Sequence, residues 1–217
     1  RGVERSRGLG DVYKRQNRFW PADLHVIGKD ILTPPHAVYW PIMLKACDLK
    51  MPKQILAHGW WTTSGIKMSK STGETVDPLN LVEQYGVDSF RYFMMREMTV
   101  GQDAEFSLER FESRYRADLG NDLGNLLSRL LHMICTYEGG VSPVVELDEN
   151  LEKNLRTSWD ETRVVLLDYF LTFRFNSGLE KIFAFVRAIN KYADERTPWK
   201  LAKSEKEQER KALRTCL

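Results

Sequence analysis

The spacing of apolar residues changes near Ser107, and this change most constrains the fold. Over residues 20–100, short apolar runs alternate with helical periods. The later segments 107–138, 148–173 and 176–195 carry helical periods only. Strands that alternate with helices predict an α/β layer with mainly parallel strands, whereas successive helical periods predict an antiparallel helix bundle. We therefore expect an α/β part followed by an all-α part.

Proline and glycine mark the element boundaries of the α/β part. Asp77-Pro78 predicts a helix start, because the acid caps free N–H groups and proline fits the first helical position. The first strand is expected to end at Gly28. We expect strands at 24–27 and 54–61, and helices at 36–47, from 77 onward and from about 88 to 97.

Three regions follow one another along the chain. Residues 1–16 show neither a helical nor a strand period, so we expect a non-native or disordered arm; a natural basic arm is the alternative. Residues 17–106 form the α/β part, and residues 107–217 form the helical part. The last helical pattern stops at the chain end, so we interpret the sequence as a piece of a longer protein.

Composition excludes some classes of protein without indicating a partner. Lys and Arg total 32 and Asp and Glu total 30, so the net charge of +2 argues neither for nor against nucleic acid. No apolar run is long enough to cross a bilayer. Cys47, Cys135 and Cys216 form no CxxC pair, so we expect neither a disulfide framework nor a metal site in this stretch.

One loop carries the clearest chemistry, and its sequence is Lys67-Met68-Ser69-Lys70-Ser71-Thr72-Gly73. It lies between a predicted strand and a capped helix, and two lysines stand three residues apart among small hydroxyl side chains. Such a loop suits a triphosphate, where negative charge builds on the leaving pyrophosphate. The chain contains neither GxxxxGK[ST] nor GxGxxG, so this is not a Walker loop. A solvated hairpin tip is the alternative for such a loop taken alone.

Longer stretches on both sides of this loop resemble a known family. The KMSKS region of class I aminoacyl-tRNA synthetases is similar to residues 58–78, HGWWTTSGIKMSKSTGETVDP. Upstream of the loop, the chain resembles the methionyl-tRNA synthetases in particular. The residues that carry this resemblance are WPADLHVIGKDI, His36 and Tyr39-Trp40-Pro41. The similarity covers roughly residues 19–205. It implies that the α/β part is the C-terminal half of a Rossmann-like catalytic domain, and that the helical part is a truncated anticodon-binding bundle.

The resemblance implies a role for each residue of the loop. Lys70, supported by Lys67, binds the phosphates of ATP and stabilises the transition state of adenylate formation, with Mg²⁺ on the phosphates. Ser69 and Ser71 supply secondary phosphate contacts. His58 contacts the nucleotide or packs at a strand end, and packing is favoured.

Residues near the end of the first strand match the adenosine and methionine sites of the family. Gly28 and Asp30 approach adenosine, since glycine allows close backbone approach and a carboxylate accepts from ribose hydroxyls. Asp30, Ile31 and His36 line the methionine pocket. A helix cap is the alternative for Asp30, and simple packing is the alternative for His36. Thr33-Pro34-Pro35 lengthens the link to His36 by one residue against the commoner pattern.

Asn125 and Arg129 form a candidate RNA-reading pair in the helical part. At about 100° per residue they lie roughly opposite the apolar stripe of their helix. An amide and a guanidinium together can read a base edge, although an ordinary solvated face is the alternative. The sequence GNLLSR is similar to the motif with which the family contacts the CAU anticodon, and both residues fall on base-contacting positions. The stripe consists of Leu123, Leu126, Leu127, Leu130, Leu131 and Ile134.

Trp199 is a third candidate anticodon contact. It follows Pro198 just after a long helical pattern, where a tryptophan can project; closing the floor of the bundle is the alternative. In the family, this Pro-Trp pair stacks on the first anticodon base, and such stacking contributes roughly 1–3 kcal/mol. Arg196 and Lys200 flank Trp199 and are expected to meet backbone phosphates.

The resemblance also defines what this stretch lacks. The resemblance implies a longer, cytoplasmic parent protein that activates methionine with ATP and transfers it to tRNA(Met). No HIGH-like tetrapeptide occurs in this stretch, so we expect this portion alone to be inactive. The α/β part, without its other half, is expected to be less stable than the helical part. A non-catalytic tRNA-binding module derived from a synthetase, and a synthetase for another amino acid, are the alternatives.

Overall fold

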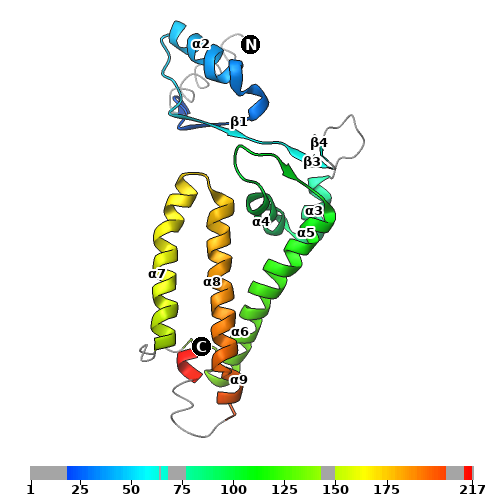
Figure 1. The fold of residues 1–217 in the computed structure, drawn as a ribbon, viewed down its shortest axis with the longest axis vertical. Coiled ribbons are helices and arrows are strands. Elements are labelled where there is room, and N and C mark those ends of the chain that lie inside the picture. The colour runs from blue at the N-terminus through cyan, green and yellow to red at the C-terminus, as the bar shows by residue number, and fades with distance from the viewer. Residues whose placement is uncertain (1–18, 64, 68–76, 143–149, 204–212, 217) are drawn as a thin grey trace, which may run out of the picture. The chain divides into compact units, whose positions relative to one another are not determined.

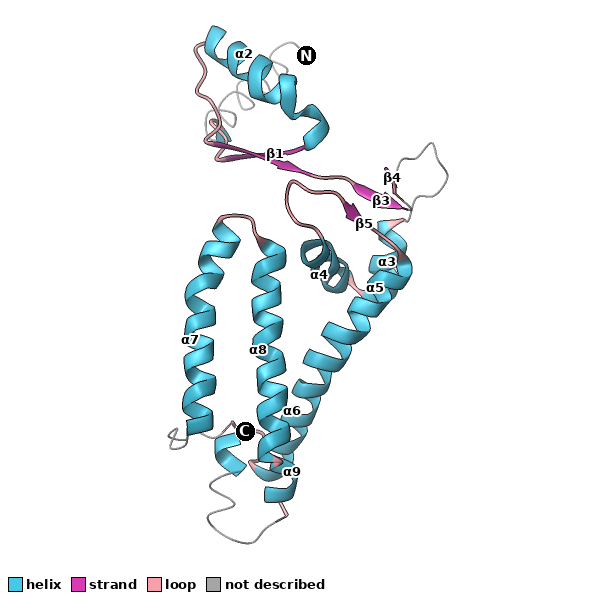
Figure 2. Cartoon of the chain, in the orientation of Figure 1, coloured by secondary structure: helices cyan, strands magenta, loops and turns pink. Residues whose placement is uncertain are grey.

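The chain divides into two compact units in the computed structural model (Figure 1). Unit 1 comprises Arg1–Met68 and Val100–Glu105, and unit 2 comprises Ser69–Thr99 and Phe106–Leu217. The structure describes residues 19–63, 65–67, 77–142, 150–203 and 213–216. Small sheets belong to unit 1, whereas the described part of unit 2 is helical (Figure 2).

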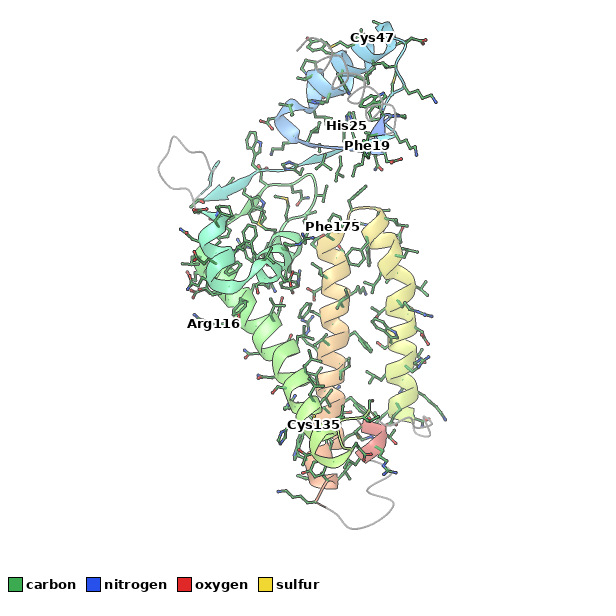
Figure 3. The ribbon with its side chains drawn as sticks, turned by 180° about the vertical axis from the view of Figure 1, so that it is seen from behind. Phe19, His25, Cys47, Arg116, Cys135 and Phe175 are labelled. Atoms are coloured by element: carbon green, nitrogen blue, oxygen red, sulfur yellow. The ribbon has the colours of Figure 1, made fainter. Side chains whose placement is uncertain are left out.

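A parallel pair of strands forms the first sheet of unit 1. β1 (Leu24–Gly28) pairs with β2 (Gln54–His58), and the register places Gly28 opposite His58. The strand predicted at 24–27 is therefore confirmed. The ring of His25, a residue of β1, lies 5.7 Å from that of Trp20 and 6.3 Å from that of Trp40, so aromatic contacts hold the connecting helix near the sheet (Figure 3).

The helical connection between β1 and β2 begins earlier than the sequence predicts. It consists of a 3₁₀ turn η1 (Lys29–Ile31), a π-helical segment η2 (Leu32–Tyr39) and α2 (Trp40–Ala46). Thr33 keeps an extended backbone, with φ −119° and ψ 128°, and interrupts this segment. Pro35 lies inside the helical segment, near its start, where its missing N–H matters little.

The strand predicted at 54–61 is divided at Gly59 and Trp60. A β-carbon at Gly59 would lie 1.8 Å from the carbonyl oxygen of Gln102, so only glycine lets the two backbone segments approach. Beyond this break the chain joins a second sheet. Its strands lie in the order β4 (Ile66–Lys67), β3 (Trp61–Thr63) and β5 (Ala104–Glu105), with β3 antiparallel to β4 and parallel to β5.

Capped helices build unit 2, as the helical periods predict. The Asp77 carboxylate accepts from the backbone N–H of Leu79 at 2.9 Å, which confirms the predicted cap. Ser107 Oγ accepts in the same way from the N–H of Arg110 at 3.1 Å. The helices are α3 (Pro78–Tyr85), α4 (Val87–Glu97), α5 (Leu108–Arg114), the π-helical η3 (Tyr115–Gly124), α6 (Asn125–Tyr137), α7 (Asn150–Leu171), α8 (Phe175–Arg196) and α9 (Pro198–Leu201).

Helices α7 and α8 lie side by side and are joined by a short turn at residues 172–174 (Figure 1). Phe175 lies at the turn end of α8 (Figure 3), where its ring is 6.1 Å from Phe170 and 6.0 Å from Phe173. On α8, Phe183 and Val186 are buried, three residues apart, which agrees with the helical period predicted for residues 176–195.

An aromatic cluster and a buried carboxylate connect α4 to the helices that follow it. Phe93 is buried against Phe106 and Phe111, at ring separations of 5.5 and 5.2 Å. The Tyr92 hydroxyl donates to the buried carboxylate of Asp118 at 2.6 Å. Burial and this hydrogen bond raise the pKa of Tyr92, so the hydroxyl stays a donor. None of the described helices combines the length and apolarity needed to cross a membrane.

Candidate functional site

The turn after β1 brings together four residues predicted to bind nucleotide or amino acid. His36 Nδ1 lies 2.8 Å from the carbonyl oxygen of Ile31, which closes the turn. A β-carbon at Gly28 would lie 2.6 Å from Asp30 Oδ1, so the carboxylate lies close to the glycine backbone. Asp30 and Ile31 are exposed, whereas His36 is half-buried. An exposed carboxylate beside open backbone at a strand end can accept hydrogen bonds from ligand hydroxyls.

A second polar group in unit 1 was not predicted from the sequence. Lys29 Nζ lies 2.7 Å from the Asp103 carboxylate and 4.6 Å from the centre of the Trp60 ring. Asp103 Oδ1 also accepts from the backbone N–H of Trp60 at 2.7 Å. The hydrogen bonds from Lys29 and Trp60 lower the pKa of Asp103. Because Lys29 and Asp103 are 74 residues apart, no local pattern could reveal their contact.

A hairpin of β3 and β4 leads into the predicted phosphate-binding loop. Gly65 turns the chain with φ +76°, a left-handed conformation that favours glycine. Lys67 lies in β4, opposite Thr62 of β3. Ser69, Lys70 and Ser71 lie outside the described residues, so the roles assigned to them stay predictions. His58 ends β2 with its Nδ1 2.8 Å from the carbonyl oxygen of Gly59, a local contact compatible with packing.

The apolar face predicted for α6 is wrong in part. Leu126 and Met133 are buried, but Leu127 and Leu131 are 47% and 57% exposed. The buried face is therefore displaced around the helix, and at about 100° per residue Arg129 borders it instead of lying opposite it. Periodicity alone could not show which part of a broad apolar stripe meets neighbouring helices.

Arg129 is held against α8 although it is partly exposed. Its Nη2 donates to Asn190 Oδ1 at 2.8 Å, and its Nη1 lies 3.5 Å from Asp194 Oδ1. The side chain of Arg129 remains 43% exposed. Asn125, one turn earlier on α6, is also exposed. Both predicted base-contacting residues of α6 are thus accessible, and the guanidinium is oriented by side chains of another helix.

Trp199 lies on α9, directly beyond the C-terminal end of α8 (Figure 1). Thr197 separates the two helices in a left-handed conformation with φ 46°, which is unusual for a β-branched residue. Pro198 is fully buried, whereas Trp199 is 38% exposed. The buried proline anchors the turn, and the tryptophan next to it keeps an accessible aromatic surface. Lys200 is exposed as well.

A buried carboxylate holds Arg196, and the expected contact of this residue with phosphates stays a prediction. Glu152 Oε1 accepts from Arg196 Nε at 2.9 Å, from Arg196 Nη2 at 2.7 Å and from the Tyr192 hydroxyl at 2.6 Å. Burial by itself raises the pKa of Glu152, but these hydrogen bonds outweigh it and hold the pKa below its usual value. A cavity of about 410 Å³ beside this group is lined mainly by apolar side chains of α6, α7 and α8.

Metal ligands do not gather in the described part of the chain. Residues 19–63, 65–67, 77–142, 150–203 and 213–216 contain no cluster of three or more His, Cys, Asp or Glu side chains arranged to hold a metal ion.

Comparison with known proteins gives consistent matches to one family. The profile of the family described as tRNA synthetases class I (M) matches residues 9–131. A methionine–tRNA ligase of Clostridium perfringens is 44% identical over 200 residues, covering 92% of this chain and 30% of the relative. A methionine–tRNA ligase of Synechocystis sp. is 44% identical over 193 residues, covering 88% of this chain and 36% of the relative. The chain therefore spans about a third of the length of these curated relatives.

Solved structures agree with these sequence matches. The crystal structure of Mycobacterium tuberculosis methionyl-tRNA synthetase bound by methionyl-adenylate superposes with a TM-score of 0.86 at 40% identity. This match covers 92% of the present chain and 39% of that chain. The free-state structure of the same enzyme gives a TM-score of 0.82 at 38% identity. On sequence and on fold, the chain belongs to the class I (M) family of tRNA synthetases.

Proposed function

We propose that this chain is part of a methionine–tRNA ligase. The supporting observation is the structural match over 92% of the chain to a synthetase that binds methionyl-adenylate. In the proposed reaction, the carboxylate of methionine attacks the α-phosphorus of ATP and releases pyrophosphate. The 3′-terminal ribose hydroxyl of tRNA(Met) then attacks the methionyl carbonyl carbon and releases AMP.

The α/β part is proposed to be the C-terminal half of a Rossmann-like catalytic domain. Gly28 and Asp30 would contact adenosine, and Asp30, Ile31 and His36 would line the methionine pocket. Lys70 and Lys67 would stabilise the charge that develops on the leaving pyrophosphate, with Ser69 and Ser71 in support. The hairpin of β3 and β4 and the Asp77 cap of α3 support this assignment, since they flank the loop on both sides. Mg²⁺ would enter as part of the ATP substrate, coordinated by its phosphates.

The helical part is proposed to form an anticodon-binding bundle. Asn125 and Arg129 would contact base edges, and Trp199 would stack on a base. The contact of Arg129 with Asp194 near the end of α8, five residues before Trp199, supports a common surface for these side chains. We propose that the part of the ligase described here does not activate methionine alone, because the HIGH-type half would be supplied by the rest of the protein.

Two assays on the complete ligase test the proposed function. We expect methionine-dependent exchange of pyrophosphate into ATP, and transfer of methionine to a tRNA with a CAU anticodon. Exchange driven by a different amino acid would contradict the proposal. Binding of tRNA without any use of ATP would instead indicate a tRNA-binding module derived from a synthetase.

A further inference from the structure

Asn190 connects the candidate base-reading residue Arg129 to the backbone of a neighbouring element. Its Oδ1 accepts from Arg129 Nη2 at 2.8 Å. Its Nδ2 donates to the backbone carbonyl oxygen of Asp122 at 2.8 Å, and the same nitrogen lies 3.4 Å from the carbonyl oxygen of Val186. One side chain on α8 therefore bridges a side chain on α6 and the backbone of η3, two elements that follow each other in sequence.

This bridge fixes which way the Asn190 amide faces. Two carbonyl oxygens lie beside one end of the amide, and carbonyl oxygens can only accept. That end must be the NH₂ group, so the amide oxygen must face the guanidinium of Arg129. A guanidinium has N–H donors and no acceptor, so the two groups match. Asn190 is half-buried, so water competes less for its hydrogen bonds than it would at a fully exposed site.

We infer that Asn190 is a positioning residue for anticodon recognition, acting through Arg129. This inference rests on the proposed function of Arg129. A planar guanidinium carries five N–H donors in a fixed fork, and one well-made contact on an outer nitrogen orients the whole plane. The bond to Asn190 engages Nη2, while the side chain stays 43% exposed. The arginine is thus held in one orientation before RNA arrives, which reduces the entropy lost on binding.

Asp194 plays a lesser part in this orientation. Its Oδ1 lies 3.5 Å from Arg129 Nη1, at the limit of a hydrogen bond, and its side chain is 66% exposed. An exposed ion pair of this kind contributes little and weakens with salt. The neutral amide contact should therefore orient Arg129 over a wide range of ionic strength.

The test measures binding of RNA hairpins by the 217-residue chain. One hairpin carries CAU in its loop, and three others each replace one of these bases. The readout is the ratio of affinities between the CAU hairpin and each altered one. We expect Arg129→Ala to abolish the preference at one base, and Asn190→Ala to reduce the same preference by about tenfold, as for loss of a hydrogen bond to a charged group. The double variant should be no worse than Arg129→Ala alone.

Asn176→Ala is the matched control. Asn176 lies on the same helix, and its Nδ2 donates to Thr99 Oγ1 at 2.9 Å, so this variant loses a comparable contact far along α8 from Asn190. The preference for CAU should survive in it.

The outcomes separate the inference from the proposed function. If Arg129→Ala leaves every ratio unchanged, or if the chain does not prefer CAU, the proposed anticodon site and the inference both fail. If Arg129→Ala abolishes the preference but Asn190→Ala leaves it intact, only the inference fails. Additive losses in the double variant, or equal losses in Asn176→Ala, would show a structural role and would also overturn the inference.

Discussion

The two units present their candidate ligand-binding side chains on different kinds of structural element. In unit 1, the described residues predicted to bind ligand lie in the turn after β1 and in β4. In unit 2, the predicted RNA-contacting residues lie on α6 and α9, and Arg129 is held by a side chain from a third helix, α8. Turns allow close approach of backbone to a ligand, whereas packed helices hold side chains in fixed orientations.

The same contrast holds for burial. Among the described residues, the buried apolar side chains of unit 1 are Ile27, Leu44 and Ala104. Unit 2 contains buried aromatic side chains such as Phe93, Phe111 and Phe183. On α2 of unit 1, the apolar residues Ile42 and Met43 are 60% and 59% exposed. Unit 1 thus buries less apolar surface of its own than unit 2, and we expect it to be the less stable unit.

The largest effect is expected for Lys70→Ala in the complete ligase. Removing one group that stabilises developing charge in the transition state costs about 10²–10³-fold in rate. Methionine-dependent pyrophosphate exchange should fall by this factor, while the KM for methionine and the affinity for tRNA change little. Exchange near the wild-type rate would show that the loop does not act on the phosphates. Equal losses in exchange and tRNA binding would point to misfolding instead of a lost phosphate contact.

Gly59→Ala should destabilise unit 1 by about 3 kcal/mol, because the new β-carbon would meet the carbonyl of Gln102 and overpack the junction between β2 and β3. Denaturant unfolding, followed separately in each unit by amide exchange, measures the effect. Gly120→Ala is the control, since the nearest atom to its new β-carbon is 3.7 Å away in helical backbone. The free energy of unfolding of Gly120→Ala should equal that of the wild type or be slightly higher. Equal losses in both variants would contradict the close approach described at Gly59.

Glu152→Gln should lower the free energy of unfolding of unit 2 by about 2 kcal/mol at pH 7, because it removes charged hydrogen bonds with Arg196 and Tyr192. The folded pKa of Glu152 lies below its usual value of 4.5, so its stabilisation is present above that value. The stabilisation is lost as the pH falls through 4.5 toward the folded pKa. The difference in free energy of unfolding between wild type and variant should therefore disappear as the pH is lowered.

Urea titrations at several pH values measure this difference. Glu161→Gln on the same helix is a suitable control, since Glu161 is exposed and its substitution removes no buried carboxylate. A difference that stays constant from neutral to acidic pH would show that the Glu152 carboxylate is not ionised in the fold.

Trp199→Ala should weaken tRNA binding by about tenfold, within the range for loss of one base stack. Pyrophosphate exchange should remain at the wild-type rate, because the substitution lies on an exposed side chain of α9. Measuring both activities on one preparation separates a lost contact from a lost fold. A fall in exchange that matches the fall in binding would show that the effect of Trp199 is not confined to tRNA binding.

The sequence predicted element boundaries best where capping chemistry is local. Asp77-Pro78 starts a helix in the structure as predicted, because a cap depends on residues within one turn. The helical period predicted from residue 107 also begins at its observed boundary, where Ser107 caps α5. The division of the strand at Gly59 was not predicted, since it depends on a backbone segment more than forty residues later. The spacing of apolar residues within a short segment does not show which distant segment it will contact.

The candidate sites show the same limit. Asn125, Arg129 and Trp199 were predicted from local motifs, and all three are exposed in the structure. The partner of Arg129 was not predicted, because the α6 stripe gave no sign that Asn190 would face it. The partner of Arg196 was not predicted either, because the Glu152 carboxylate that holds it lies 44 residues away.

The central claim is that bases are read by unit 2 alone, at α6 and α9. Amide exchange of the 217-residue chain, measured with and without an RNA hairpin carrying CAU, tests it most directly. We expect slower exchange on RNA binding within α6 and around residues 197–201, with no change in β1 and the turn that follows it. Protection confined to β1 and its turn, or the same protection by a hairpin with an altered loop, would contradict the account.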